Sequence, residues 1–231
     1  MNGTLYGVGV GPGDPELMTL KAVRLIEENE IIALPGAVPT ETIAYQIAIQ
    51  AAPALADKKL LPIYMPMTHN HDELQRNHQK GAQIIEEYLK QGKNVIFLTL
   101  GDPTIYSTFT YIQQIVALHG YSTAMVSGIT SFCAAAASVN IPLVTWNEQL
   151  HIIPAVHNTK LPLPESGNYV LMKSGKKMKQ VKEILAASKL EVVTVENCGT
   201  ANEHIYRGVN EIPDDAGYYS LIIAKEPNSN D

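Results

Sequence analysis

Short apolar runs separated by amphipathic stretches dominate the first half of the chain. The runs at 4–8, 31–34 and 94–100 lack the alternation of apolar and polar residues seen in half-exposed strands. Such runs are typical of parallel strands buried on both faces of a sheet. Further strands are predicted at 59–65 and 123–126. Between the runs, apolar residues recur every three or four positions, which predicts helices at 15–29, 40–51, 70–91 and 107–119.

The second half follows a different pattern. Helices are predicted at 134–137 and 178–187, and strands at 151–154, 168–172, 191–195 and 218–224. Turns rather than helices separate most of these strands, so we expect mixed strand directions. The fold class is therefore α/β, with two α/β domains at residues 1–119 and 120–231.

Composition narrows the class of protein. The chain has 231 residues, of which 45% are hydrophobic and 17% are charged, as in a soluble chain with a sizeable core. A formal net charge of −6 argues against a nucleic-acid or anionic-membrane surface. The apolar runs are shorter than the roughly 20 residues that cross a bilayer, and we expect a cytoplasmic protein. Cys133 lies in an alanine-rich run and is expected to be buried and reduced.

Three small, glycine-containing loops each follow an apolar strand and precede a helix, at 9–14, 101–106 and 127–131. In the first, Asp14 is placed to cap the following helix and Pro15 suits its first turn. Ligands of open α/β sheets bind at the carboxyl ends of the strands, where such loops gather. The three loops together therefore predict a binding site.

The glycines do not match the common nucleotide-binding patterns. They fall at every second residue from Gly7 to Gly13, no acidic residue ends the second strand, and no Gly-Lys-Ser/Thr sequence follows. An uncharged or zwitterionic ligand fits better than a phosphate. His69, His71 and His78 are interpreted as a solvated polar segment, so no metal site is expected. Asp102 ends a buried strand and has two open interpretations, a chemical carboxylate or a cap for the next helix.

At these loops the sequence resembles the tetrapyrrole (class III) methyltransferases. The resemblance rests on Gly-Val-Gly-Val-Gly-Pro-Gly-Asp-Pro-Glu-Leu at 7–17, Thr-Leu-Gly-Asp-Pro-Thr-Ile-Tyr-Ser-Thr at 99–108 and Ser-Gly-Ile-Thr-Ser at 127–131. It covers nearly the whole chain. The form of the second loop is most similar to the branch that methylates precorrin-2 or cobalt-factor II at C-20.

The resemblance implies a homodimeric enzyme whose active site lies in a cleft between two domains and which transfers a methyl group from S-adenosylmethionine to a tetrapyrrole carbon. It implies Asp102 and Tyr106 as candidate bases and Gly11, Gly13, Asp14, Lys21 and Lys176 at the substrate. Lys173 and Arg207 are further candidate cations for the substrate carboxylates. The residues implied for S-adenosylmethionine are Pro12, Leu100, Gly101, Asp102, Ile105, Tyr106, Thr130, Ser131, Met172, Lys173, Ser174, Tyr219, Ser220 and Leu221.

Two other functions stay open at this point. A relative acting on RNA would need a basic surface with aromatic residues, and the net charge and the low aromatic content, 6%, argue against it. A carrier that binds tetrapyrroles without catalysis would not need the second and third loops, which the sequence retains.

Overall fold

The computed structural model describes residues 1–66, 68, 70–155, 163 and 166–227. The chain divides into two compact units, Met1–Thr130 and Ser131–Asp231, each containing one sheet. The expected pair of α/β domains is therefore present, but the division follows Thr130 instead of residue 119. The reason is that β5 (Ser122–Val126) pairs in parallel with β1 (Thr4–Gly9) and so belongs to the first sheet. The expected cleft between the domains stays a prediction.

The first unit is built on a parallel sheet with strand order β3-β2-β4-β1-β5. The remaining strands are β2 (Ile31–Pro35), β3 (Lys59–Ile63) and β4 (Val95–Thr99). All five residues of β4 are buried, as its unbroken apolar run predicts. Pro62 lies in β3, where the missing N–H costs little because β3 is an edge strand of this sheet.

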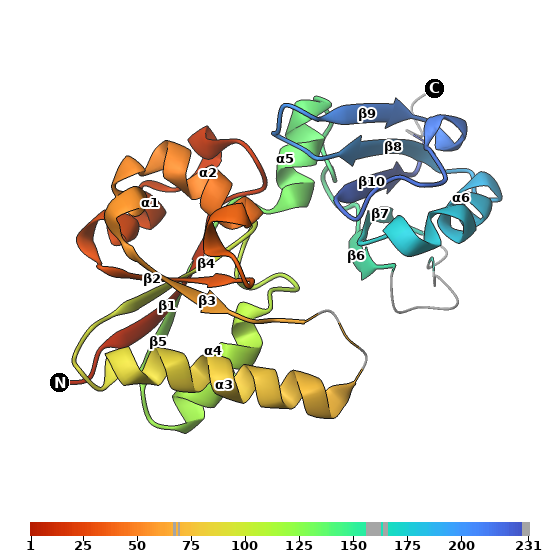
Figure 1. The fold of residues 1–231 in the computed structure, drawn as a ribbon. Helices are drawn as coiled ribbons and strands as arrows, with labels where there is room; N and C mark the ends of the chain where they lie inside the picture. The colour runs from red at the N-terminus through yellow and green to blue at the C-terminus, as the bar shows by residue number, and fades with distance from the viewer. Residues whose placement is uncertain (67, 69, 156–162, 164–165, 228–231) are drawn as a thin grey trace. The chain divides into compact units, whose positions relative to one another are not determined.

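Helices cover both faces of this sheet (Figure 1). One core cluster packs α1 (Leu20–Glu28) and α2 (Ile43–Ala51) on one face, and another packs α3 (His71–Leu89) and α4 (Phe109–Leu118) on the other. The helix expected from residue 15 begins later. Asp14 caps only a 3-10 turn, Pro15–Leu17, and Thr19 then caps α1 by accepting a hydrogen bond from the Ala22 N–H.

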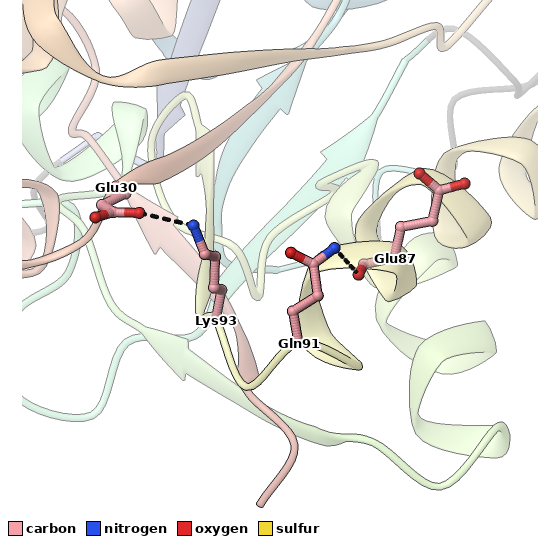
Figure 2. Close-up of polar contacts among 4 residues, drawn as sticks. All are labelled: Glu30, Glu87, Gln91 and Lys93. Carbon is pink, nitrogen blue, oxygen red and sulfur yellow. Dashed lines mark hydrogen bonds and ion pairs between the residues drawn. The ribbon is translucent and has the colours of Figure 1, made fainter.

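The amino-terminal edge of the first sheet is held by polar contacts (Figure 2). Lys93 precedes β4 and donates a hydrogen bond of 3.0 Å to Glu30, which precedes the neighbouring β2. This hydrogen bond lowers the pKa of the Glu30 carboxyl. The Gln91 amide donates to the Glu87 carbonyl at the end of α3. These contacts are at the edge opposite the three glycine-containing loops.

The second unit contains a mixed sheet with strand order β6-β7-β10-β8-β9. β6 and β7 are parallel, whereas β10 is antiparallel to both β7 and β8, which confirms the expected mixture of directions. The α6 helix packs against one face of this sheet, and α5 contacts β10. The bounds are α5 (Ser131–Ser138), β6 (Leu150–Pro154), β7 (Asn168–Met172), α6 (Met178–Ala186), β8 (Glu191–Glu196), β9 (His204–Arg207) and β10 (Ser220–Lys225).

Two expectations for this unit need correction. The strand β9 was not predicted, because four mostly exposed residues at a sheet edge carry no apolar pattern. Cys133 was expected to be buried, but its side chain is exposed on α5, whose buried residues are Phe132 and the neighbouring alanines. Cys198 is buried, and this burial raises the pKa of its thiol to about 11. Among the described residues no helix is long and apolar enough to span a membrane.

The two thiols should react at very different rates. At pH 8, we expect a soluble aromatic disulfide to modify Cys133 rapidly and Cys198 slowly, because the Cys198 thiolate is scarce and shielded. The absorbance change on labelling native protein measures both phases. The fast phase should vanish in Cys133→Ser and persist in Cys198→Ser. A fast phase that survives Cys133→Ser would contradict the placement of Cys198.

Candidate functional site

The three glycine-containing loops meet at one edge of the first sheet. They follow β1, β4 and β5, which are adjacent and parallel, so their carboxyl ends lie together. The first two loops are hydrogen-bonded to each other: the Gly101 N–H donates to the Gly11 carbonyl at 2.8 Å, and the Gly11 N–H donates to the Gly101 carbonyl at 3.3 Å. The sequence predicts this gathering, and the structure shows its geometry within the first unit.

The third loop approaches so closely that side chains are excluded. A Cβ atom on Gly128 would lie 2.2 Å from the Gly101 carbonyl oxygen and 2.9 Å from the Gly9 carbonyl carbon. A Cβ atom on Gly9 would lie 2.4 Å from the same Gly101 oxygen. Neither distance is possible for a real side chain, so Gly9 and Gly128 are required by packing between backbones.

Asp102 ties the second loop to the third. One carboxylate oxygen accepts hydrogen bonds from the N–H and the hydroxyl of Thr104, and the other accepts from the Gly128 N–H at 3.1 Å. The side chain is 7% exposed. The helix cap that the sequence left open is not found, and the carboxylate instead holds the second and third loops together. The N-cap residue of α4 is Thr108, which makes no side-chain cap, and the Phe109 N–H at the start of the helix donates instead to the Ser107 hydroxyl.

Tyr106 and Thr104 are the exposed residues of the second loop. The backbone of Tyr106 is unusual. This residue adopts a left-handed backbone conformation with φ of 48°, and 45% of its surface is exposed. Ile105 and Leu100 are half-buried, and Gly101 is buried with φ of 68°. The candidate bases Asp102 and Tyr106 are thus four residues apart on one loop but differ sharply in exposure.

The first loop and its surroundings hold the expected substrate residues of this unit. Gly11, Pro12 and Gly13 are buried, and Asp14 is half-buried with its carboxylate accepting from the Glu16 N–H. Lys21 is exposed on α1. The third loop ends in Thr130, whose hydroxyl is buried with no hydrogen-bond partner among the described residues. The next residue, Ser131, is half-buried and begins α5.

In the second unit, the expected cofactor residues gather at one end of the sheet. Met172 ends β7 and Ser220 begins the antiparallel neighbour β10. A Cβ atom on Gly175, just after Ser174, would lie 3.2 Å from the Tyr218 nitrogen, so the two segments touch. We call Met172–Gly175 together with Gly217–Leu221 the serine edge.

The serine edge contains two buried hydroxyls without partners. Ser174 is fully buried and Ser220 is 2% exposed, and neither hydroxyl has a hydrogen-bond partner among the described residues. Lys173 adopts a left-handed conformation with φ of 59°. The Tyr219 ring is 46% exposed, and Leu221 is buried in β10.

Sequence reasoning missed two polar residues beside this edge. Glu196, at the end of β8, accepts hydrogen bonds from the Gly217 N–H at 2.6 Å and the Tyr206 hydroxyl at 3.1 Å. Thr194, on the same strand, has a fully buried hydroxyl without a partner in the described part of the chain. The signal in the sequence was the alternation of Thr194, Val195 and Glu196 at the end of a predicted strand.

The remaining candidates lie elsewhere. Arg207 is exposed. His69 and the side chain of Lys176 lie outside the described residues. His78 stacks on Tyr111 with ring centroids 4.8 Å apart. In the part of the chain that the structure describes, no three His, Cys, Asp or Glu side chains form a group able to hold a metal.

Comparison with solved structures identifies the fold. The fold matches that of uroporphyrin-III C-methyltransferase from Thermus thermophilus, solved with S-adenyl homocysteine, with a TM-score of 0.71 over 96% of this chain and 92% of that one. The two chains are 19% identical, so this likeness concerns the fold. The chain therefore shares the fold of that protein.

The family follows from the sequence comparisons. The model of the tetrapyrrole (corrin/porphyrin) methylases matches residues 4–212, and the chain belongs to this family. It is thus an S-adenosylmethionine-dependent methyltransferase, as the resemblance implied.

Individual relatives carry more detailed names. The chain is 33% identical to the probable cobalt-precorrin-2 C(20)-methyltransferase of Methanocaldococcus jannaschii, over 74% of this chain and 72% of that protein. It is 28% identical to the cobalt-precorrin-2 C(20)-methyltransferase of Salmonella typhimurium, over 98% of both. It is also 31% identical to the cobalamin biosynthesis protein CobIJ of Mycobacterium tuberculosis, spanning 96% of this chain but 46% of that longer protein.

The close approach of the loops predicts a steric effect at Gly128. In Gly128→Ala the new methyl group has to displace the Gly101 carbonyl, which should lower the free energy of unfolding by about 3 kcal/mol. Gly101→Ala is the matched control, because its Cβ makes only an ordinary contact, 4.0 Å from the Ile129 carbonyl oxygen, and meets the cost of a left-handed alanine, about 1–2 kcal/mol. Urea unfolding measures both. A larger loss in Gly101→Ala would contradict the steric argument.

The hydrogen bonds of Asp102 predict a second effect on stability. In Asp102→Asn, an amide replaces a carboxylate that accepts bonds from two loops, so the unfolding free energy should fall by about 1.5–3 kcal/mol. Thr104→Val removes one of these bonds and should cost about 0.5–1.5 kcal/mol. Thermal and urea unfolding of both variants give the comparison. An Asp102→Asn protein as stable as the parent would exclude the loop-shaping role.

Proposed function

We propose that this chain transfers a methyl group from S-adenosylmethionine to C-20 of precorrin-2, or of its cobalt form, in cobalamin biosynthesis. The family match over residues 4–212 supports a tetrapyrrole as the acceptor. Two relatives that align over most of this chain are named C(20)-methyltransferases of cobalt-precorrin-2. The second loop, with its Gly-Asp-Pro-Thr-Ile-Tyr-Ser-Thr sequence at 101–108, also resembles that branch.

The residues present fit the methyl donor. The observation that carries the proposal is the set of buried hydroxyls without partners on Thr130, Ser174 and Ser220, at positions that the resemblance assigns to the donor. A buried hydroxyl without a hydrogen bond is unfavourable, so such groups favour a polar ligand. S-Adenosylmethionine offers amine, carboxylate, ribose and adenine groups that can satisfy them. No phosphate cradle is needed.

Further residues would complete the donor site. On the first unit, the proposal assigns it the backbone of Leu100 and Gly101 and the side chains of Pro12, Ile105 and Tyr106. On the second unit it assigns Ser131 and the serine edge. When bound, S-adenosylmethionine supplies a methyl group on a positively charged sulfur.

The chain's own contribution is to position the reactants and exclude water. Holding two reactants in line can lower a barrier by roughly 7–11 kcal/mol at best, and no covalent nucleophile is required. The glycines of the first loop, Gly11 and Gly13, leave room for a large flat acceptor. We assign Lys21, Lys173 and Lys176 to binding the carboxylates of the acceptor. Asp14 is assigned to the polar edge of the acceptor.

Between the two candidate bases, the structure supports Tyr106. The Asp102 carboxylate already accepts three hydrogen bonds from the loops and is buried, whereas the Tyr106 ring lies at the exposed rim of the second loop. The proposal therefore assigns removal of the proton after methyl transfer to Tyr106. Asp102 acts by keeping the second and third loops together.

We also infer that the enzyme works in the cytoplasm as a homodimer, which the resemblance implies. Nucleic acid is not proposed as a substrate, because the chain carries a formal net charge of −6. Light scattering of the purified protein gives the oligomeric state.

Methyl transfer tests the proposed activity directly. The protein is incubated with S-adenosylmethionine and either precorrin-2 or its cobalt form, and the tetrapyrrole is followed by mass spectrometry and NMR. We expect one added methyl group at C-20, and none when S-adenosylhomocysteine replaces the donor. A methyl group at another carbon, or none with either acceptor, would overturn the assignment.

Calorimetric titration tests the donor site separately from turnover. Ser174→Ala and Ser220→Ala should each weaken S-adenosylmethionine binding about three- to tenfold, the effect of one neutral hydrogen bond. Ser188→Ala is the matched control, since its hydroxyl already donates to the Leu185 carbonyl. Unchanged donor affinity in both serine-edge variants would refute their assignment.

A further inference from the structure

A pair of buried hydroxyls closes the base of the second loop. Thr99 is the last residue of β4 and Ser107 lies just before α4, and their oxygens are 2.9 Å apart. Thr99 is 6% exposed and Ser107 is 9% exposed. The Ser107 hydroxyl also accepts from the Phe109 N–H, and the Ser107 carbonyl accepts from the Thr110 hydroxyl. Ser107 is therefore fixed on both its side chain and its backbone.

Tyr106, immediately before Ser107, has a strained backbone conformation with φ of 48°. A left-handed conformation is unfavourable for a bulky residue such as Tyr106, and it persists only where neighbouring contacts impose it. On one side of Tyr106 the loop is held by Asp102, which accepts from Thr104, and by the turn from the Asp102 carbonyl to the Ile105 N–H. On the other side it is held by the pair Thr99–Ser107. Strain between two such anchors is typical of a functional residue.

We propose that Ser107 is a positioning residue for methyl transfer, and that its hydroxyl bond to Thr99 holds Tyr106 in the conformation that presents its ring at the site. The expected effect on kcat rests on the proposed function, whereas the expected change of φ at Tyr106 does not. Loss of the Ser107 hydroxyl would let the backbone at Tyr106 relax toward negative φ, which redirects the ring. Loss of the Thr99 hydroxyl, at the end of β4, should have the same effect, because it removes the other half of this hydrogen bond.

The structural consequence is tested without turnover. Crystal structures of Ser107→Ala and of Thr99→Val, which removes the partner hydroxyl with little change of shape, should show a negative φ at Tyr106. The exposed Thr108 makes no side-chain cap to α4, so Thr108→Ala is the matched control and should keep the positive φ. A positive φ at Tyr106 in both Ser107→Ala and Thr99→Val would overturn the proposal.

The kinetic consequence is tested by a double-mutant cycle on methyl transfer. Ser107→Ala should lower kcat about tenfold in the parent protein. In a Tyr106→Gly background, where the ring and the strain are both absent, adding Ser107→Ala should change kcat less than about twofold. An equal loss in both backgrounds would show a general structural role and refute the positioning role. If the parent protein transfers no methyl group, the proposed function fails, while the crystal structures still decide the conformational claim.

Discussion

The first unit depends on how closely three backbones can approach at the ends of adjacent strands. Neighbouring parallel strands lie about 4.8 Å apart, so loops leaving β4, β1 and β5 have little room unless side chains are absent. Gly9 and Gly128 meet this demand, and both approach the same Gly101 carbonyl. The hydrogen bonds of Gly11 and Asp102 then connect the three loops. The result is a set of three loops held together mainly through their backbones.

The buried polar side chains of this chain serve two purposes. In the first unit, the buried side chains of Thr99, Asp102 and Ser107 satisfy one another or the backbone, so they stabilise the loops. In the serine edge, the hydroxyls of Ser174 and Ser220 stay without partners among the described residues. A polar group that is satisfied internally maintains shape, whereas one that is not satisfied favours a ligand. This contrast separates residues that organise the site from residues proposed to bind.

Much of the fold and part of the site could be predicted from the sequence. The unbroken apolar run of β4 identifies a central strand, and the loops after three such runs predict a common edge. The domain boundary could not be placed, because only strand pairing shows that β5 belongs with β1. The bond between Asp102 and the Gly128 N–H joins residues 26 positions apart, and no local pattern encodes it. The exposure of Cys133 likewise depends on which face of the alanine-rich helix α5 is buried, and a run of alanines does not distinguish the faces.

The buried state of Asp102 has a consequence for how such sequences are interpreted. The Gly-Asp-Pro motif is the most conspicuous in the chain, yet its carboxylate is occupied by contacts within the protein. A match to that motif therefore reports the architecture of the loops and says little about the molecule that is methylated. Under the proposed function, discrimination between one tetrapyrrole and another would reside in the residues proposed at the acceptor, such as the half-buried Asp14 and the exposed Lys21. Changing the acceptor by design would begin at these residues, with the motif left intact.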